Sequence, residues 1–176
     1  MLKQIQNRRS CRQFTTDKVE KGKVDQLLKA ALWAPTSKNN RPWEFVVVEN
    51  EATLASLSKC KPHGAAFLAN APLGIVVLGN PAKSDVWVED CSIASILMQM
   101  TGESLGLGST WIQIRRRMYD DHTTAAEKVR SILGIPSHLE VLDIMAFGYK
   151  AKERAPYDED ILLWERVHYG HYKNEG

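Results

Sequence analysis

Apolar positions along the chain switch between a helical period and a strand period. Between the polar residues near position 17 and Pro35, apolar side chains recur with i, i+3, i+4, i+7 spacing, which predicts a helix ending near Trp33. These apolar positions are Val24, Leu27, Leu28 and Ala31. We expect Thr16 or Asp17 to cap the start of this helix, and Pro35 to stop it.

The same two periods predict the remaining elements. Further helices are expected at 2–8, 51–61, 85–105 and 124–133. Short β-branched runs predict strands at 45–48, 74–78, 109–114 and 139–148, the last of which is also compatible with a helix. In the longest helix one apolar face is expected to contain Val86, Ile93, Leu97, Met100 and Leu105. Interleaved helices and strands indicate an α+β or α/β sheet surrounded by helices.

Composition places the chain among ordinary globular proteins. It has 176 residues, 44% hydrophobic, and 23 basic against 21 acidic side chains give a net charge of 23 − 21 = +2. One domain spanning 1–176 is expected. The small charge excludes intrinsic disorder and polyanion binding by bulk charge, and we expect no nucleic-acid partner. The three cysteines lack metal or CxxC spacing, and no signal peptide or membrane-length apolar run is present, so we expect a cytoplasmic protein with reduced thiols.

The sequence lacks the common signatures of catalysis by protein side chains. There is no GxGxxG turn, phosphate-binding GxxxxGK[ST] loop, HExxH pair or GxSxG elbow. None of the five histidines has a convincing metal spacing. We therefore expect no metal ion.

Four short segments carry the candidate chemistry. Arg8-Arg9-Ser10-Cys11-Arg12 combines guanidinium groups, which bind phosphate bidentately, with a hydroxyl. Residues 35–43 form a polar loop stiffened by two prolines, and the glycines of 106–108 allow a backbone or a flat ligand to approach closely. Residues 148–154 add three cations after the last strand. Each segment could also be plain structure: a solvated basic run, a connector, a helix cap or an exit from the sheet.

A fifth segment, Arg115-Arg116-Arg117, is a run of three arginines. Nucleic-acid binding is disfavoured because the net charge is small and no reader motif is present. These arginines could instead line the mouth of a cofactor or substrate site.

Taken in order, these segments resemble the nitroreductase-like family of FMN-dependent oxidoreductases. The matching motifs are RRSxR at 8–12, APTSxNxRPW at 34–43, WxxD at 87–90, GLGSxWI at 106–112, GY at 148–149 and VHY at 167–169. The resemblance covers nearly the whole chain. It implies an α+β fold with a mainly antiparallel sheet and a homodimer with FMN at the interface. It also implies that the aromatic tail, 155–176, packs on the partner subunit.

The resemblance also implies roles for individual residues. Arg8, Ser10, Lys152 and Arg154 would bind the phosphate or ribityl end of FMN, with Arg9 beside them, and Arg12 would face the pyrimidine edge of the ring. Ile112 and Gln113 would offer backbone groups to the ring. The opposite subunit would contribute Pro35, Thr36, Ser37 and Asn39. Arg41 and Gln113 depart from the family's usual Gln and Gly, and no clear polar residue in 63–70 matches an extra ring contact that some members have.

The implied activity is hydride transfer from NADH or NADPH to FMN, followed by ping-pong transfer of electrons to a nitroaromatic, a quinone or a similar acceptor. Dehalogenation, enone reduction and flavin fragmentation are alternatives within flavin chemistry. A flavin-binding or anion-binding module without turnover is an alternative of a different class. The sequence does not distinguish NADH from NADPH.

Overall fold

The computed structural model describes residues 1–172 and contains every predicted helix and strand. The helices are α1 (Leu2–Asn7), α2 (Lys21–Leu32), α3 (Glu51–Leu57), α4 (Trp87–Ser104) and α5 (Ala125–Leu133). The strands are β1 (Trp43–Val48), β2 (Leu73–Gly79), β3 (Leu107–Gln113) and β4 (Glu140–Tyr149). Short 3-10 turns lie at Ser37–Asn39, Ala66–Asn70, Glu159–Ile161 and Trp164–Arg166. The segment that was compatible with either a strand or a helix is strand β4.

The four strands form one antiparallel sheet in the order β1-β2-β4-β3. Val76 of β2 faces Val46 of β1 on one side and Ile144 of β4 on the other, and Ile144 also faces Ile112 of β3. This confirms the α+β class with an antiparallel sheet. Periodicity alone could not have given the strand direction, because a strand buried on both faces has a continuous apolar run in either arrangement.

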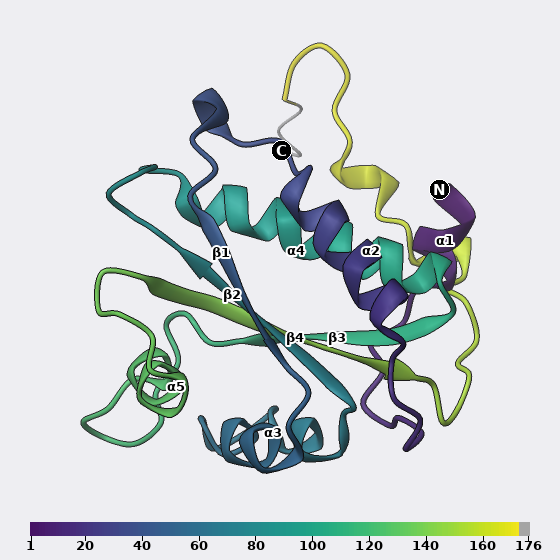
Figure 1. The fold of residues 1–176 in the computed structure, drawn as a ribbon. Coiled ribbons are helices and arrows are strands. Elements are labelled where there is room, and N and C mark those ends of the chain that lie inside the picture. Colours follow the sequence, from purple (N-terminus) through teal and green to yellow (C-terminus); the bar gives the residue numbers. More distant parts are fainter. Residues whose placement is uncertain (173–176) are drawn as a thin grey trace.

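Helices cover both faces of the sheet (Figure 1). On one face, α2 and α4 enclose a core that includes Leu27, Met98 and Phe147. On the other face, α3 and α5 enclose a second core that includes Leu54 and Val129. Because β2 and β4 are covered on both sides, their residues are buried almost without interruption.

The apolar face predicted for the longest helix is only partly correct: Leu97 and Leu105 pack against the core, but none of the five predicted positions is fully buried. In α4 the fully buried positions are Cys91, Ala94, Ser95 and Met98, and the positions Asp90, Gln99 and Gly102 are also buried. Ile93 and Ile96 are instead 37% and 44% exposed. Small side chains bring the helix close to the sheet: a Cβ added to Gly102 would lie 3.0 Å from the Phe147 ring. The face of α4 that packs on the sheet is therefore the face with small side chains, because they allow close packing, and not the most apolar face.

The predicted start of α2 is also wrong. The helix begins at Lys21 with Glu20 as its N-cap, not at Thr16 or Asp17. The preceding segment is extended, and the Thr15 N–H donates to the Tyr149 carbonyl at 2.9 Å. Pairing with the end of β4 keeps this segment out of the helix.

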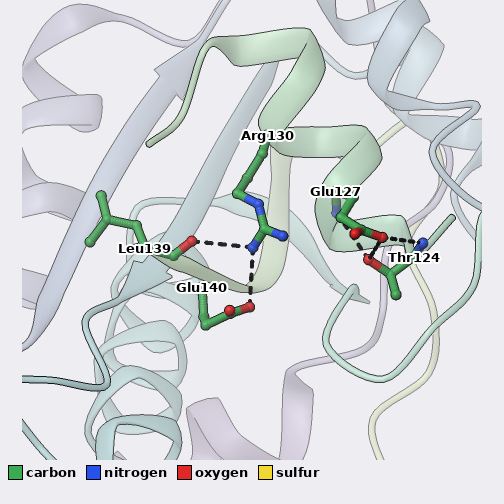
Figure 2. Close-up of polar contacts among 5 residues, drawn as sticks. All are labelled: Thr124, Glu127, Arg130, Leu139 and Glu140. Atoms are coloured by element: carbon green, nitrogen blue, oxygen red, sulfur yellow. Dashed lines mark hydrogen bonds and ion pairs between the residues drawn. The ribbon is translucent and has the colours of Figure 1, made fainter. Parts of the chain in front are cut away.

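Helix α5 is tied to the start of β4 by polar contacts (Figure 2). Thr124 and Glu127 form a reciprocal capping box, in which the Thr124 hydroxyl accepts from the Glu127 N–H at 3.1 Å. Arg130 donates to the Glu140 carboxylate at 3.2 Å and to the Leu139 carbonyl at 3.4 Å. These contacts fix the connection between β3 and β4.

Within residues 1–172, none of the helices has both the length and the apolar character needed to cross a membrane.

Candidate functional site

The N-terminal segment lies directly against the start of β3. Ser10 forms a parallel bridge with Ser109, and the Cys11 N–H donates to the Ser109 carbonyl at 2.9 Å. A Cβ added to Gly108 would lie 2.7 Å from the Cys11 sulfur and from the Lys150 side chain. Side chains of the chain itself, those of Cys11 and Lys150, thus fill the space that Gly108 leaves open.

Beside this contact lies a cavity of about 290 Å³. Its walls are formed by Ser10, Cys11, Arg12, Gln13, Lys152 and Arg154. Within residues 1–172, neither Arg12, Lys152 nor Arg154 forms an ion pair. Three uncompensated cations and a hydroxyl around one cavity suit an anion such as a phosphate.

Arg8 and Arg9, the other two arginines of the N-terminal cluster, do not line the 290 Å³ cavity. Arg9 donates to the Ala155 carbonyl, and its guanidinium lies 4.3 Å from the centre of the Tyr157 ring. It also lines a small adjoining cavity of about 20 Å³. Arg8 lines neither cavity; its N–H ends α1 by donating to the Gln4 carbonyl at 2.9 Å. The structure therefore gathers Ser10, Arg12, Lys152 and Arg154, with Arg9 at the edge, and leaves Arg8 outside.

Lys150, the first cation after β4, forms ion pairs with two acidic side chains. Its ammonium is 2.9 Å from the Glu103 carboxylate and 3.5 Å from the Glu153 carboxylate. The positive charge of Lys150 is thus compensated within the chain, whereas that of Lys152 and Arg154 is not.

A second cavity, of about 800 Å³, shares Arg12 and Gln13 with the first. The Arg12 guanidinium lies 5.8 Å from the centre of the Phe67 ring, and Asn70 contributes to the wall. Sequence reasoning missed Phe67 and Asn70. They belong to a 3-10 turn, which has no periodic signal, and only the tertiary fold brings that turn to Arg12.

The end of β3 is held by three side-chain hydrogen bonds. The Gln113 amide accepts from the Trp111 indole at 2.9 Å and donates to the Arg115 carbonyl at 2.9 Å. The Lys61 ammonium donates to the Gln113 carbonyl at 2.8 Å, and burial lowers the pKa of Lys61. Ile112 is buried. The side chain of Gln113 therefore stiffens the strand end, while the backbone carbonyl of Gln113 already accepts a hydrogen bond from Lys61.

The polar loop between α2 and β1 lies at the other end of the sheet. The Asn80 N–H, just after β2, donates to the Pro42 carbonyl, and Gly79 pairs with Glu140 at the start of β4. Ser10 pairs with Ser109 opposite Phe147, seven residues farther along β4 than Glu140, which is about 23 Å at 3.3 Å per residue. Pro35, Thr36, Ser37 and Asn39 are therefore not brought to the cavity of their own chain.

Internal hydrogen bonds give this loop a fixed form. The Arg41 N–H donates to the Thr36 hydroxyl at 3.1 Å, and the Arg41 guanidinium donates to the Asn39 side chain at 2.9 Å. Lys38, Asn39 and Arg41 have positive φ angles of 50°, 56° and 46°, a conformation that non-glycine residues adopt at some cost. The unusual Arg41 thus helps to shape the loop.

The aromatic tail begins along α1 and then lies in the open. The Tyr157 N–H donates to the Gln6 carbonyl at 3.0 Å. Farther along, Trp164 is 67% exposed and Tyr169 is 82% exposed. The prediction that the tail packs on a partner remains a prediction, and residues 173–176 lie outside the described part of the chain.

Over the described residues, no group of three or more histidine, cysteine or acidic side chains is placed to hold a metal ion. Cys11, Cys60 and Cys91 are all free and buried.

Comparison with known proteins agrees with the fold and the motifs. The family model described as "Nitroreductase family" matches residues 5–61 and 58–149. A protein of Archaeoglobus fulgidus, provisionally named NADH dehydrogenase/NAD(P)H nitroreductase, is 33% identical over 172 residues, which is 95% of each chain. A Thermus thermophilus NADH dehydrogenase is 28% identical and covers 89% of this chain and 92% of its own. The solved structure of an FMN-dependent nitroreductase from Clostridium difficile R20291 has 44% identity and a TM-score of 0.96, covering 98% of this chain and 100% of its own. With two family-model segments that together span most of the chain, this protein belongs to the nitroreductase family.

Proposed function

We propose that the protein is an FMN-dependent NAD(P)H oxidoreductase that passes electrons to a nitroaromatic, a quinone or a similar acceptor. The observation that carries this proposal is the set of uncompensated cations, Arg12, Lys152 and Arg154, around the 290 Å³ cavity beside Ser10. The names of the similar proteins, which include an FMN-dependent nitroreductase and an NADH dehydrogenase, agree with it.

The donor set fits the phosphate of FMN. A phosphate monoester has a charge near −2 at neutral pH, and charge-assisted hydrogen bonds from Arg and Lys compensate the loss of its hydration. We assign Ser10, Lys152 and Arg154 to the phosphate and ribityl end, with Arg9 beside them. Arg8 is kept as a phosphate ligand in the proposal, although its side chain lines neither cavity.

Arg12 and the end of β3 would serve the ring of the cofactor. When bound, FMN supplies the hydride acceptor and electron carrier, so no nucleophile of the protein is needed. The Arg12 guanidinium would stabilise the negative charge that reduction places at the pyrimidine edge. Ile112 and Gln113 would present backbone groups to the ring; because the Gln113 carbonyl accepts from Lys61, Gln113 would use its N–H.

We further propose that the active form is a homodimer. The loop with Pro35, Thr36, Ser37 and Asn39 lies too far along the sheet to complete the cavity of its own chain, but it could complete that of a second copy. Ile93 and Ile96 on α4, and the described part of the tail, 155–172, expose apolar surface that a partner would bury. Each copy is then one domain, 1–176. Donor and acceptor would occupy one open face in turn, which gives ping-pong kinetics.

A comparison of FMN with riboflavin tests the phosphate assignment, because riboflavin lacks only the phosphate. We expect the wild-type protein to bind FMN at least tenfold more tightly than riboflavin, since charge-assisted contacts are the stronger hydrogen bonds. Arg154→Gln and Lys152→Gln should reduce that preference, while the control Lys29→Gln, on the exposed surface of α2, should not. The same titration of Arg8→Ala tests whether Arg8 binds the phosphate. Equal binding of FMN and riboflavin by the wild-type protein would contradict the proposal.

A further inference from the structure

Three arginines follow β3 directly and take no part in the cavity described above. Arg115, Arg116 and Arg117 form a tight turn, in which the Arg117 N–H donates to the Ile114 carbonyl at 3.0 Å. Backbone bonds fix the turn on both sides: the Arg115 N–H donates to the Leu142 carbonyl and the Ala125 N–H donates to the Arg117 carbonyl. The three side chains are therefore presented from a rigid support.

A fourth cation, Lys61, is hydrogen-bonded to the end of the same strand. Lys61 donates to the Gln113 carbonyl at 2.8 Å, and the positive charge of Arg117 is close enough to add to the lowering of the Lys61 pKa that burial causes. The Arg115 guanidinium lies 5.7 Å from the centre of the Trp87 ring. We call Lys61, Arg115, Arg116 and Arg117 the β3-end patch.

The β3-end patch has no compensation by acidic groups. In the described part of the chain, none of its four members forms an ion pair with a carboxylate. Arg116 also has a positive φ of 59°, which costs free energy for a residue with a Cβ. Repulsion between like charges and a strained turn both oppose this arrangement in the free protein. The net charge of the chain is only +2, yet four cationic residues lie at or near the end of β3. A bound anion would relieve the repulsion between them.

The position of the patch indicates which anion it would meet. Arg115 follows two residues after Gln113, which the proposed function places at the ring of FMN. A nicotinamide stacked on that ring would place its phosphates beyond the edge of the ring, where long cationic side chains close to Gln113 would meet them. NADH and NADPH share a pyrophosphate, and NADPH has an additional phosphate with a charge near −2. Guanidinium groups match phosphate geometry in a bidentate manner.

We propose that the β3-end patch binds the phosphates of the nicotinamide donor and gives the enzyme a preference for NADPH over NADH. This inference rests on the proposed function, because it needs the donor to reach the ring beside Gln113. Arg116 and Arg117, the two exposed members, are assigned to the additional phosphate of NADPH. Arg115 and Lys61, which are partly buried, are assigned to the pyrophosphate.

The binding test uses the FMN-loaded protein and the oxidised dinucleotides, so that no turnover occurs. Calorimetric titration should show NADP⁺ binding about tenfold or more tightly than NAD⁺, with a difference that shrinks as salt screens the charges. Arg117→Gln and Arg116→Gln should each weaken NADP⁺ binding by about tenfold, with a smaller effect on NAD⁺. Arg117→Lys should restore part of the loss, and the control Lys29→Gln should change neither affinity. FMN content and melting temperature are compared across the variants to confirm that each is folded.

The outcomes separate this inference from the proposed function. If NADH and NADPH reduce the flavin but the wild-type protein binds NADP⁺ and NAD⁺ equally, the inference is wrong and the proposed function stands. The inference is also wrong if the arginine variants alter only the KM of a negatively charged acceptor such as 4-nitrobenzoate. If neither dinucleotide reduces the flavin, the proposed function fails and the inference fails with it.

Discussion

The Asp90 carboxylate accepts a hydrogen bond from the backbone N–H of Ser37 at 2.8 Å, across 53 positions of sequence. Its second oxygen accepts from the Ser84 hydroxyl at 2.9 Å, and Asp90 is only 3% exposed. One carboxylate near the start of α4 thus anchors the loop that joins α2 to β1. This explains why an acidic residue belongs to the WxxD motif at 87–90: it fixes a loop that we assign to the partner's cofactor site.

Asp90→Ala removes the anchor of this loop. Hydrogen bonds to a charged group contribute about 1.5–3 kcal/mol each, and Asp90 accepts two, so we expect the free energy of unfolding, measured with urea, to fall by about 3 kcal/mol or more. Ser84→Ala serves as the matched control, because it removes one contact of Asp90 and leaves the bond to Ser37. An equal loss in both variants would show that the Ser37 bond does not stabilise the fold.

Because Asp143 is a buried carboxyl group, we expect the stability of the protein to depend on pH in an unusual direction. The residue is fully buried on β4, and one of its oxygens accepts from the Ser95 hydroxyl at 2.8 Å. The other oxygen has no hydrogen-bond partner among residues 1–172. Burial raises the pKa of Asp143 well above its usual value, and the bond from Ser95 only partly opposes this. The folded protein therefore keeps a proton that the unfolded chain releases, and stability falls as pH rises from the unfolded pKa towards the folded pKa.

Asp143→Asn removes this loss because the amide is neutral and can still accept from Ser95. The free energy of unfolding of the variant relative to wild type should rise by about 1.4 kcal/mol per pH unit between the two pKa values. Urea unfolding at several values from about pH 4 to about pH 7 measures it. Ser95→Ala is the control that keeps the acid and hence the slope. A difference between variant and wild type that does not change with pH would contradict the assignment.

The cysteines are expected to be unreactive in the folded protein. Burial raises the pKa of Cys60 to about 11 and that of Cys91 to about 12, and it also raises the pKa of Cys11. At about pH 8 only about one Cys60 thiol in a thousand is ionised, so a thiol-disulfide reagent should react slowly with native protein and fully after unfolding. Cys11 lines the 290 Å³ cavity, so it should react first and bound FMN should slow it. Rapid reaction that persists in Cys11→Ser would contradict this account.

The dimer is tested at the exposed face of α4. Ile96→Glu places a charge on surface that the proposed partner buries, so we expect the protein to become monomeric and to lose FMN, as measured by analytical ultracentrifugation with absorbance detection. Met118→Glu is the control, because Met118 is 48% exposed but lies in the connection between β3 and α5. A dimeric, FMN-bearing Ile96→Glu protein would place the interface elsewhere.

Sequence patterns predicted the existence and order of the helices and strands, because each element has an apolar period of its own. They failed where a distant contact decided the outcome. Pairing of Thr15 with β4 removed the predicted cap of α2, and the small residues of α4 packed inward while Ile93 and Ile96 stayed outside. The direction of the strands came from the resemblance and not from the pattern.

The candidate site was predicted in part. The motifs identified Ser10, Arg12, Lys152 and Arg154, which the fold gathers around one cavity. Nothing in the local sequence could show that Lys61 would hold the Gln113 carbonyl, or that Phe67 would lie beneath Arg12. Such contacts join segments about 50 residues apart, and they follow from packing between elements.

The most direct test of the central claim is an anaerobic visible spectrum of the FMN-loaded protein, recorded before and after addition of NADH or NADPH. We predict flavin bands that bleach on addition of the dinucleotide and return when a quinone or a nitroaromatic is added. Bands that persist with both dinucleotides would contradict an NAD(P)H oxidoreductase and favour a binding role without turnover. The absence of flavin bands after FMN has been supplied would contradict the proposed cofactor itself.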